Sequence, residues 1–256
     1  MKRILRWLAV TIGVLLIAVI VLLVVAFSGR QAITDGFELN GVRIVKDGMV
    51  SVGMIQLGTD AVALVDAGKD RSGKAILAEL TRRGLGPASV KAILLTHGHP
   101  DHIAAVPLLP EAEVMALDHE VGVVEGRAGS RGPLTRLIPV RPTGVKVGRV
   151  LRDGETISLG QVTVRVYAVP GHTAGSAAFL VNRVLFLGDS ADATSDRRVQ
   201  GAAWSVTDDT AQNRRSLVSL ADRLRQEGEQ VDVLAFSHSG VLTHGLEPLT
   251  VFARRR

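Results

Sequence analysis

Four side chains that commonly bind metal ions fall within six consecutive positions of the sequence. They are His97, His99, Asp101 and His102. Neutral imidazole and carboxylate oxygen are both ligands of Zn²⁺ and related divalent ions. The cluster directly follows the apolar run Val90–Leu95, and Gly98 and Pro100 favour a turn that directs several side chains toward one point. The spacing therefore predicts a metal site at the end of a buried strand.

Three further residues of ligand type each follow an apolar run. These are His172 after Val162–Pro170, Asp189 after Val184–Leu187, and His238 after Val231–Phe236. Loops at strand ends are where α/β proteins gather functional groups. A single such residue is more often a cap or a hydrogen-bonded loop residue, but five of the seven histidines share this context. We therefore predict one common site, and we expect His119 and His244, which lack the context, to lie on the surface.

Alternating apolar runs and turn signals predict the elements that position these residues. Helices are predicted over Ser72–Gly84 and Thr210–Gln226, and the Gly-, Pro- and Arg-rich segment Gly126–Gly144 is predicted to be a loop near the mouth of the site. Bunched strands with helices between them indicate a layered α/β fold. The predicted strands are Val42–Val45, Met49–Leu57, Ala61–Val65, Val90–Leu95, Val114–Leu117, Val145–Leu151, Val162–Val169, Ala177–Val181, Val184–Leu187 and Val231–Phe236.

Composition narrows the chemistry further. The chain has 256 residues, of which 46% are hydrophobic and 27 are glycine, as expected for a globular fold with many turns. It has no cysteine, which excludes disulfides, thiolate nucleophiles and cysteine-ligated zinc. The net charge is +5, but the arginines are scattered rather than gathered into a basic stripe, so no nucleic-acid partner is expected.

The amino-terminal segment differs from the rest of the chain. No charged residue occurs from Trp7 to Ser28, and the run reaches the ~20 apolar residues that a helix needs to span a bilayer. Basic residues precede the run, so the positive-inside rule places the following domain outside the cytoplasm. Residues 1–30 are therefore predicted to be a single transmembrane anchor, and residues 31–256 the globular domain. The alternative is a signal segment cleaved after Ser28, which would give a secreted protein.

The motif His97-Gly98-His99-Pro100-Asp101-His102, followed in order by His172, Asp189 and His238, resembles that of the metallo-β-lactamase superfamily. The resemblance extends over essentially all of residues 31–256 and implies a four-layer αββα sandwich. It implies that His97, His99 and His172 hold one ion, that Asp101, His102 and His238 hold a second, and that Asp189 bridges both. Asp66 matches an early aspartate of the family that supports a ligand histidine. Since typical metallo-β-lactamases lack the bridging aspartate, the chain looks more like the glyoxalase II, lactonase and phosphodiesterase branches.

The resemblance implies a metal-dependent hydrolase with Asp101, His102 and Asp189 as catalytic residues. Two divalent ions, expected to be Zn²⁺ with Fe or Mn as alternatives, would share a hydroxide that cleaves an ester, thioester, lactone or phosphodiester of a small molecule. One alternative is a single-iron enzyme resembling persulfide dioxygenases. Another is a non-catalytic, membrane-tethered metal-binding module. The sequence does not indicate the substrate, the identity of the metal or the oligomeric state.

Overall fold

A computed structural model describes residues 3, 6–8, 10–14, 17 and 28–255. Among these residues, no helix is both long enough and apolar enough to cross a membrane. The transmembrane helix predicted over Trp7–Ser28 thus has no support in the structure, and most of that run lies outside the described residues. The division of the chain near residue 30 stays a prediction.

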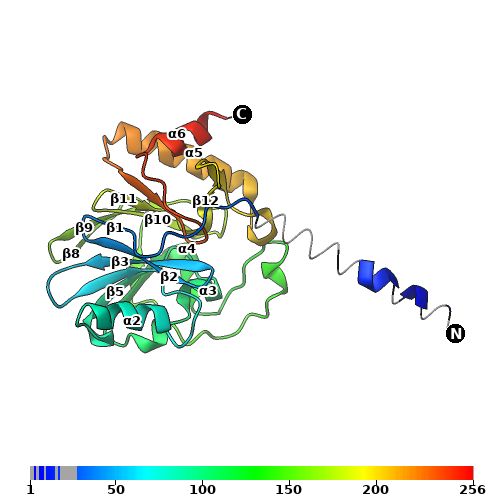
Figure 1. Ribbon diagram of the computed structural model, residues 1–256, viewed down its shortest axis with the longest axis horizontal. Helices are drawn as coiled ribbons and strands as arrows, with labels where there is room; N and C mark the ends of the chain where they lie inside the picture. Colours follow the sequence, from blue (N-terminus) through cyan, green and yellow to red (C-terminus); the bar gives the residue numbers. More distant parts are fainter. Residues whose placement is uncertain (1–2, 4–5, 9, 15–16, 18–27, 256) are drawn as a thin grey trace.

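Two β-sheets form the centre of the molecule (Figure 1). In the first, the strands up to β4 are antiparallel and those from β4 onward are parallel. Its order is β1 (Glu38–Leu39), β2 (Val42–Asp47), β3 (Val50–Gln56), β4 (Val62–Val65), β5 (Val90–Leu94), β6 (Glu113–Leu117) and β7 (Arg149–Leu151). The second has the order β14 (Val233–Ala235), β11 (Val184–Phe186), β10 (Ala177–Val181), β9 (Val162–Ala168) and β8 (Thr156–Leu159). A separate ribbon pairs β12 (Ala191–Ala193) with β13 (Val199–Gly201).

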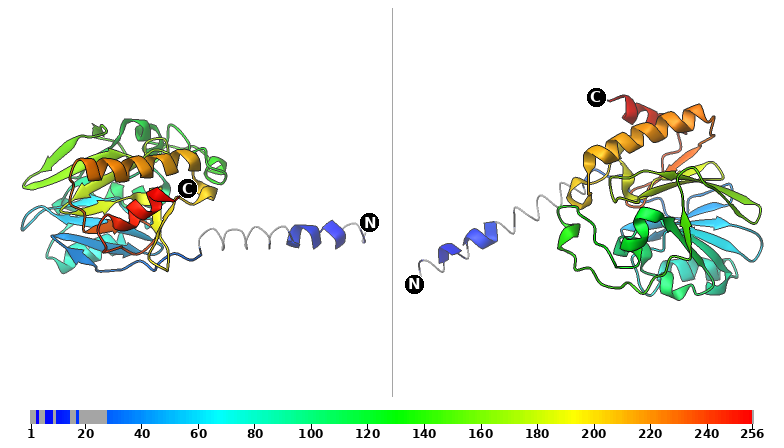
Figure 2. Two further views of the ribbon diagram at one scale, coloured as in Figure 1. Left: turned by 90° about the horizontal axis from the view of Figure 1, so that it is seen from above. Right: turned by 180° about the vertical axis from the view of Figure 1, so that it is seen from behind.

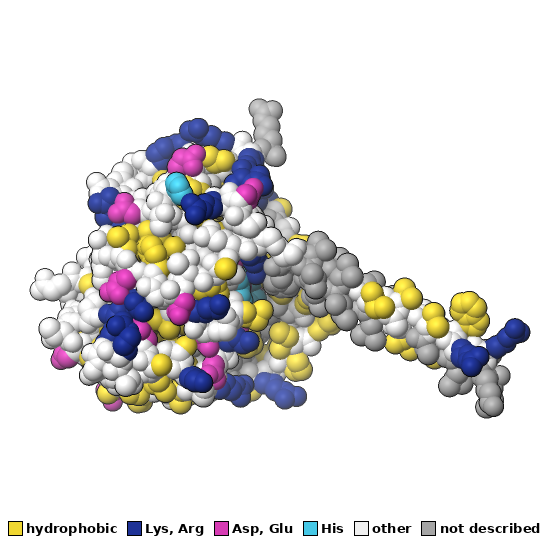
Figure 3. All heavy atoms as spheres, viewed as in Figure 1, with side chains coloured by type: hydrophobic (Ala, Val, Ile, Leu, Met, Phe, Trp, Pro, Cys, Tyr) yellow, Lys and Arg dark blue, Asp and Glu magenta, His cyan; other side chains and the backbone are white. Residues whose placement is uncertain are grey.

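Helices cover the outer face of each sheet (Figures 1 and 2). On the side of the first sheet lie α2 (Lys74–Arg82), α3 (Pro100–Ile103) and α4 (Asp118–Val124). On the side of the second lie α5 (Thr210–Gln226) and α6 (Glu247–Arg254). On the face drawn in Figure 3, Lys and Arg side chains are dispersed, many of them beside Asp or Glu.

Three separate hydrophobic cores hold these layers together. The middle core lies between the sheets and joins side chains such as Leu94 of β5 to Phe179 of β10. A second joins the first sheet to α2 through Ile76, and a third joins the second sheet to α5 and α6 through residues such as Leu217. Three cores separate four layers, so the predicted α/β sandwich is confirmed.

Most predicted elements are present with bounds within two residues of those expected, and α5 has the predicted bounds. Asp209 caps the amino end of α5 by accepting the Gln212 N–H with its side chain, and the helix buries the predicted apolar face. The strand predicted over Val145–Leu151 was wrong in its first half, because only Arg149–Leu151 forms a strand and pairs with β6. Seven other short helices and strands were not predicted from the sequence: β1, β8, β12, β13, α3, α4 and α6.

The topology brings the ends of several strands together. β4, β5 and β6 run parallel, so their carboxyl ends share one edge of the first sheet. In the second sheet β11 and β14 are parallel neighbours, so the segments that follow them also meet at one edge. The predicted ligands follow β5, β11 and β14 and lie in the turn between β9 and β10. The fold therefore gathers them at one end of the sandwich.

Candidate metal centre

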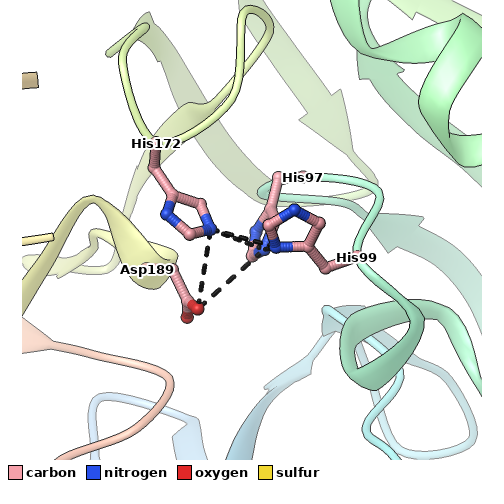
Figure 4. Close-up of side chains that lie close together, drawn as sticks. All are labelled: His97, His99, His172 and Asp189. Atoms are coloured by element: carbon pink, nitrogen blue, oxygen red, sulfur yellow. Dashed lines mark hydrogen bonds and ion pairs between the residues drawn. The ribbon is translucent and has the colours of Figure 1, made fainter. Parts of the chain in front are cut away.

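Three histidine nitrogens point at one another on one side of the site (Figure 4). His97 Nε2 lies 3.0 Å from His99 Nδ1 and 3.2 Å from His172 Nε2, and the remaining pair is 3.1 Å apart. Ligands held 2.0–2.1 Å from a tetrahedral zinc ion lie about 3.3 Å from each other. The three nitrogens are thus close to the separation that one shared ion requires.

A second group lies beside the first and consists of Asp101, His102 and His238. His238 Nε2 is 3.4 Å from Asp101 Oδ2, and His102 Nε2 is 3.9 Å from Asp101 Oδ1. Asp189 faces both groups. Its Oδ2 lies 3.7 Å from His172 Nε2 and 3.1 Å from His238 Nε2, and its Oδ1 lies 3.4 Å from His102 Nε2. The structure thus brings all seven predicted residues together, while His119 and His244 are exposed and outside the cluster, as expected.

The loop carrying Asp189 approaches the first cluster through a glycine. Asp189 lies in the short helix η4 (Gly188–Ser190), directly after β11. Gly188 has a φ of +55°, and a Cβ at this position would lie 2.7 Å from the side chain of Thr96. Any other residue here would push the Asp189 loop away from the end of β5. Asn213 of α5 supports the loop from the other side by donating to the Ser190 carbonyl at 2.9 Å.

The outer nitrogen of every histidine in the centre has a partner. The partners, with nitrogen–oxygen distances, are Thr96 Oγ1 for His97 (3.1 Å), Ser130 Oγ for His99 (2.8 Å), Thr207 Oγ1 for His172 (3.2 Å), Asp66 Oδ2 for His102 (2.8 Å) and the Met49 carbonyl for His238 (2.9 Å). Such partners fix the orientation of a ligand imidazole and the nitrogen that it presents to a metal. The predicted supporting role of Asp66 matches its contact with His102.

Two buried atoms of the centre have no hydrogen-bond partner among the described residues. They are His102 Nε2 and Asp189 Oδ1, which face each other at 3.4 Å as an ion pair without a hydrogen bond. Buried polar atoms in native proteins are almost always satisfied, and an ion is one accepted reason for an exception. Together with the converging nitrogens, these atoms show that the donor set fits a pair of divalent cations.

The two groups differ in protonation. Burial lowers the pKa of His97, of His99 and of His172, the last to about 3, so these rings are neutral. Burial also lowers the pKa of His102 and of His238. The negative charge of Asp189 and its neighbours raises the pKa of both rings by more than burial lowers it. The pKa of His102 is raised well above its usual value, and that of His238 rises to about 10. The first group is thus ready to bind a metal, whereas the second must exchange protons for an ion.

Glu120 of α4 is a functional candidate that sequence reasoning missed. Its side chain is completely buried. Its carboxylate accepts the N–H of Gly98 at 2.7 Å, the N–H of Gly175 at 3.0 Å and the hydroxyl of Thr173 at 2.7 Å. Burial raises its pKa to about 7 against these hydrogen bonds. Glu120 therefore ties the His97–His102 loop to the loop that carries His172, and only a prediction of α4 itself could have revealed it.

The predicted loop 126–144 does lie beside the centre. Ser130 contacts His99, and the N–H of Gly132 donates to Asp208 Oδ1 at 2.9 Å. The Leu134 N–H donates to the Ser205 carbonyl at 2.8 Å, next to Trp204, whose side chain is 48% exposed. Trp204 is thus a surface residue beside this loop rather than part of a core.

The αββα sandwich and a cluster of five histidines and two aspartates at its edge define a metal-binding protein of the α/β class. The model of the Metallo-beta-lactamase superfamily matches residues 45–238. Because this match includes well over half of the chain and the whole centre, the chain belongs to that superfamily.

The individual proteins that this chain resembles align with only part of it. The chain is 32% identical over 102 residues to a hydroxyacylglutathione hydrolase of Shewanella sp. (strain ANA-3), an alignment covering 40% of this chain and 35% of that protein. It is 28% identical over 161 residues to a probable metallo-hydrolase of Burkholderia pseudomallei, covering 57% and 52%. The chain thus spans between a third and about half the length of these curated relatives.

Solved structures support the fold. The metallo-beta-lactamase MIM-1 of Novosphingobium pentaromativorans superposes with a TM-score of 0.65 at 21% identity, covering 88% of each chain. A metallo-beta-lactamase family protein of Thermus thermophilus superposes with a TM-score of 0.58 at 26% identity, covering 84% of this chain and 79% of that one.

Proposed function

We propose that the protein is a metal-dependent hydrolase that cleaves an ester, thioester, lactone or phosphodiester bond of a small molecule. The observation that carries the proposal is the position of Asp189, whose two oxygens face both ligand groups. A carboxylate placed between two groups of ligands suits a pair of ions that act on one substrate. The names of the curated relatives, among them a hydroxyacylglutathione hydrolase, are consistent with hydrolysis.

In this proposal His97, His99 and His172 hold one ion, and Asp101, His102 and His238 hold the other. When bound, such ions supply a hydroxide near neutral pH and polarise the bond to be cleaved. The protein's own contribution is to place the ligands and to tune their charge. Asp189 and Asp101 provide the negative charge that retains two cations, and Asp66 holds the ring of His102 so that Nε2 faces Asp189.

Asp101 marks the side from which a substrate approaches. Its side chain is 35% exposed, whereas that of Asp189 is 10% exposed and that of His102 is 1% exposed. Asp101, His102 and Asp189 surround the space between the two groups, so we assign them the catalytic roles. No protein nucleophile is required, which agrees with the absence of cysteine.

The test is Asp189→Ala, with His119→Ala as a control that removes a ligand-type side chain from the surface. Metal content is measured by elemental analysis, and hydrolysis is measured on ester, thioester, lactone and phosphodiester panels. We expect the variant to lose at least one ion per chain and to slow hydrolysis about 100-fold or more. Unchanged metal content and turnover would refute the role of Asp189, and a single iron per chain in the wild type would favour the oxygenase alternative.

We also propose that residues 1–30 tether the domain to a membrane and place it outside the cytoplasm. The support is the uncharged run from Trp7 to Ser28 and the basic residues before it. Membrane fractionation combined with the mass of the mature protein tests this. A mature protein that begins at Gly29 would contradict the tether and favour secretion.

A further inference from the structure

A large cavity opens directly beside the metal centre. Its volume is about 640 Å³, and two of the proposed metal ligands, His99 and Asp101, form part of its wall. Pockets of roughly 300–1,000 Å³ are typical of small-molecule sites. The cavity is therefore large enough for a substrate that extends well beyond the bond to be cleaved.

Most of the side chains around the cavity are apolar. They come from α3 and the turn after it, from α4, and from the loop of residues 126–144. Examples are Ile103 of α3, Val123 of α4, and Ile138 and Val140 of the loop. A wall of this kind stabilises an apolar group because it removes the methylenes of that group from water. The chemistry of the wall thus selects a hydrocarbon chain rather than a polar or sugar-like group.

Three cationic side chains also line the cavity, and only one carboxylate opposes them. The cations are Lys69, Arg71 and Arg141, and the carboxylate is Asp101, which faces the metal centre. Among the described residues, none of these cations forms an ion pair. Exposed arginines elsewhere are commonly paired, as Arg127 is with Glu125 at 2.9 Å. Unpaired cations around an apolar cavity are complementary to an anionic group on the ligand.

The loop 126–144 holds its part of the wall in place at both ends. At one end, the Arg127 N–H donates to the Gly122 carbonyl at 2.8 Å. At the other, the Thr143 hydroxyl donates to the Val124 carbonyl at 2.6 Å. Gly126 has a φ of +70°, and a Cβ there would collide with the carbonyl of Arg141. The loop therefore closes on itself at its base, with Arg141 fixed beside the cavity.

We propose that this cavity binds the hydrocarbon chain of an anionic amphiphile, whose carboxylate or phosphate lies against Lys69, Arg71 and Arg141. The inference rests on the proposed function, for which it names the substrate class: an ester or related compound that carries a medium-length apolar chain and an anionic group. The chain occupies the apolar wall, and the bond to be cleaved lies at the end formed by His99 and Asp101.

Binding of unreactive probes to the metal-loaded, full-length protein tests the inference without turnover. The probes are decanoate, decyl phosphate, 1-decanol and acetate, and the measurement is isothermal titration calorimetry. We expect decanoate or decyl phosphate to bind at least tenfold more tightly than both 1-decanol and acetate. The stronger of the two anions identifies the headgroup class. Decanoate and decyl phosphate that bind no more tightly than acetate and 1-decanol would overturn the proposal.

Variants of the cationic side chains test whether the anionic probes bind in this cavity. Arg71→Gln combined with Arg141→Gln should weaken the binding of decanoate about tenfold and leave that of 1-decanol within about twofold, since two exposed charges that face the anion are lost. The control is Arg136→Gln combined with Arg152→Gln, two exposed arginines that form no ion pair among the described residues and do not line the cavity. Equal effects of the two pairs on decanoate would show non-specific charge attraction and would overturn the proposal.

A second pair of variants, with a control in the same loop, tests the apolar side chains of the cavity. Ile138→Ser combined with Val140→Ser should weaken both decanoate and 1-decanol about tenfold, whereas Leu137→Ser, in the same loop but outside the cavity wall, should change neither. If the probes bind as expected while no ester panel is hydrolysed, the proposed function fails but the binding inference stands. If esters are hydrolysed while the cavity variants leave probe binding unchanged, the inference fails and the proposed function stands.

Discussion

The five histidines of the centre do not all present the same ring nitrogen. His99 turns Nδ1 toward the centre, whereas the other four turn Nε2. The difference follows from the outer partner, because Ser130 holds Nε2 of His99 from the far side. The convergence of these side chains could be predicted from the sequence, since their types and their positions after apolar runs are local features. Four of the five outer partners could not, because only the folded chain brings residues such as Ser130 and Met49 to the site.

Glu120 is the residue outside the ligand set whose removal should affect the centre most. Glu120→Gln keeps the shape but turns an amide N–H₂ toward the N–H of Gly98 or Gly175, so one buried donor loses its acceptor. We expect a loss of about 1–3 kcal/mol of stability and a metal affinity reduced roughly 10–100-fold. Thermal unfolding of the metal-free protein and a competitive Zn²⁺ titration measure the two effects. Asp118→Asn, at the exposed start of the same helix, is the control. A fall in stability with no change in affinity would show that Glu120 only holds the fold.

Metal binding should release protons from the second group alone. At pH 6 the raised pKa of His102 and of His238 keeps both rings protonated, whereas the lowered pKa of His172 leaves it neutral. Saturating the metal-free protein with Zn²⁺ at pH 6 should therefore release about two protons per chain. A pH indicator in weakly buffered solution measures the release. His238→Ala should release about one proton fewer, and His119→Ala should match the wild type. Zinc uptake at pH 6 without proton release would contradict the assignment.

Helix α2 is fixed to the first sheet by a network of charges. Glu79 is 8% exposed and lies 2.9 Å from Arg43 of β2, 2.6 Å from Arg82 and 2.7 Å from Arg83. Hydrogen bonds from Arg82 and Arg83 and the charge of Arg43 outweigh burial and lower the pKa of Glu79 to about 2. A single carboxylate thus joins the helix to a strand that lies far from it in sequence.

The stability that Glu79 contributes should depend on pH. Its folded pKa of about 2 lies below the usual 4.5, so the contribution is complete above pH 4.5 and is lost as the pH falls toward 2. After allowance for solvent screening around the exposed arginines, we expect Glu79→Gln to lower stability by about 1–2 kcal/mol at pH 7. Urea unfolding at pH 7 and at pH 2.5 measures the difference, which should shrink at the lower pH. An equal difference at both values would contradict the ionic origin. Asp222→Asn, in an exposed pair with Arg225, should have little effect at either pH.

The elements that could be predicted are the long, periodic ones. Helix α5 buries Leu217, Leu220 and Leu224 on one face, and this period is visible in the sequence. Helix α4 was missed because its seven residues include one glycine and three valines, which are poor helix formers. It is stabilised by tertiary contacts, among them the burial of Val124 and the hydrogen bonds of Glu120. The three-residue strands of the β12–β13 ribbon are likewise too short for any pattern to indicate them.

At the scale of the whole molecule, the metal centre joins the two halves of the sandwich. The cluster after β5 belongs to the first sheet, whereas His172, Asp189 and His238 belong to loops of the second. The layer order was predicted only through the family resemblance, because strand neighbours such as β4 and β5 are separated by an entire helix. Residue patterns alone indicated a layered α/β fold but not which strand lies beside which.

Removing the ions should therefore weaken the attachment between the halves without unfolding the domain. The apolar core between the sheets does not depend on metal. Ions present at about a thousandfold excess over their Kd add about 4 kcal/mol of stability. Calorimetry with and without a chelator should show a lower melting temperature for the metal-free protein and a single cooperative transition in both states. A melting temperature that the chelator leaves unchanged would show that the centre holds no ion that links the two sheets.

The contact between His238 and the Met49 carbonyl has a consequence for how the site can change. Met49 lies in the tight turn between β2 and β3, and its side chain is 55% exposed. The imidazole is held by the main chain, so any amino acid at position 49 supplies the same acceptor. The exposed side chain at position 49 can therefore change without loss of the acceptor that orients His238.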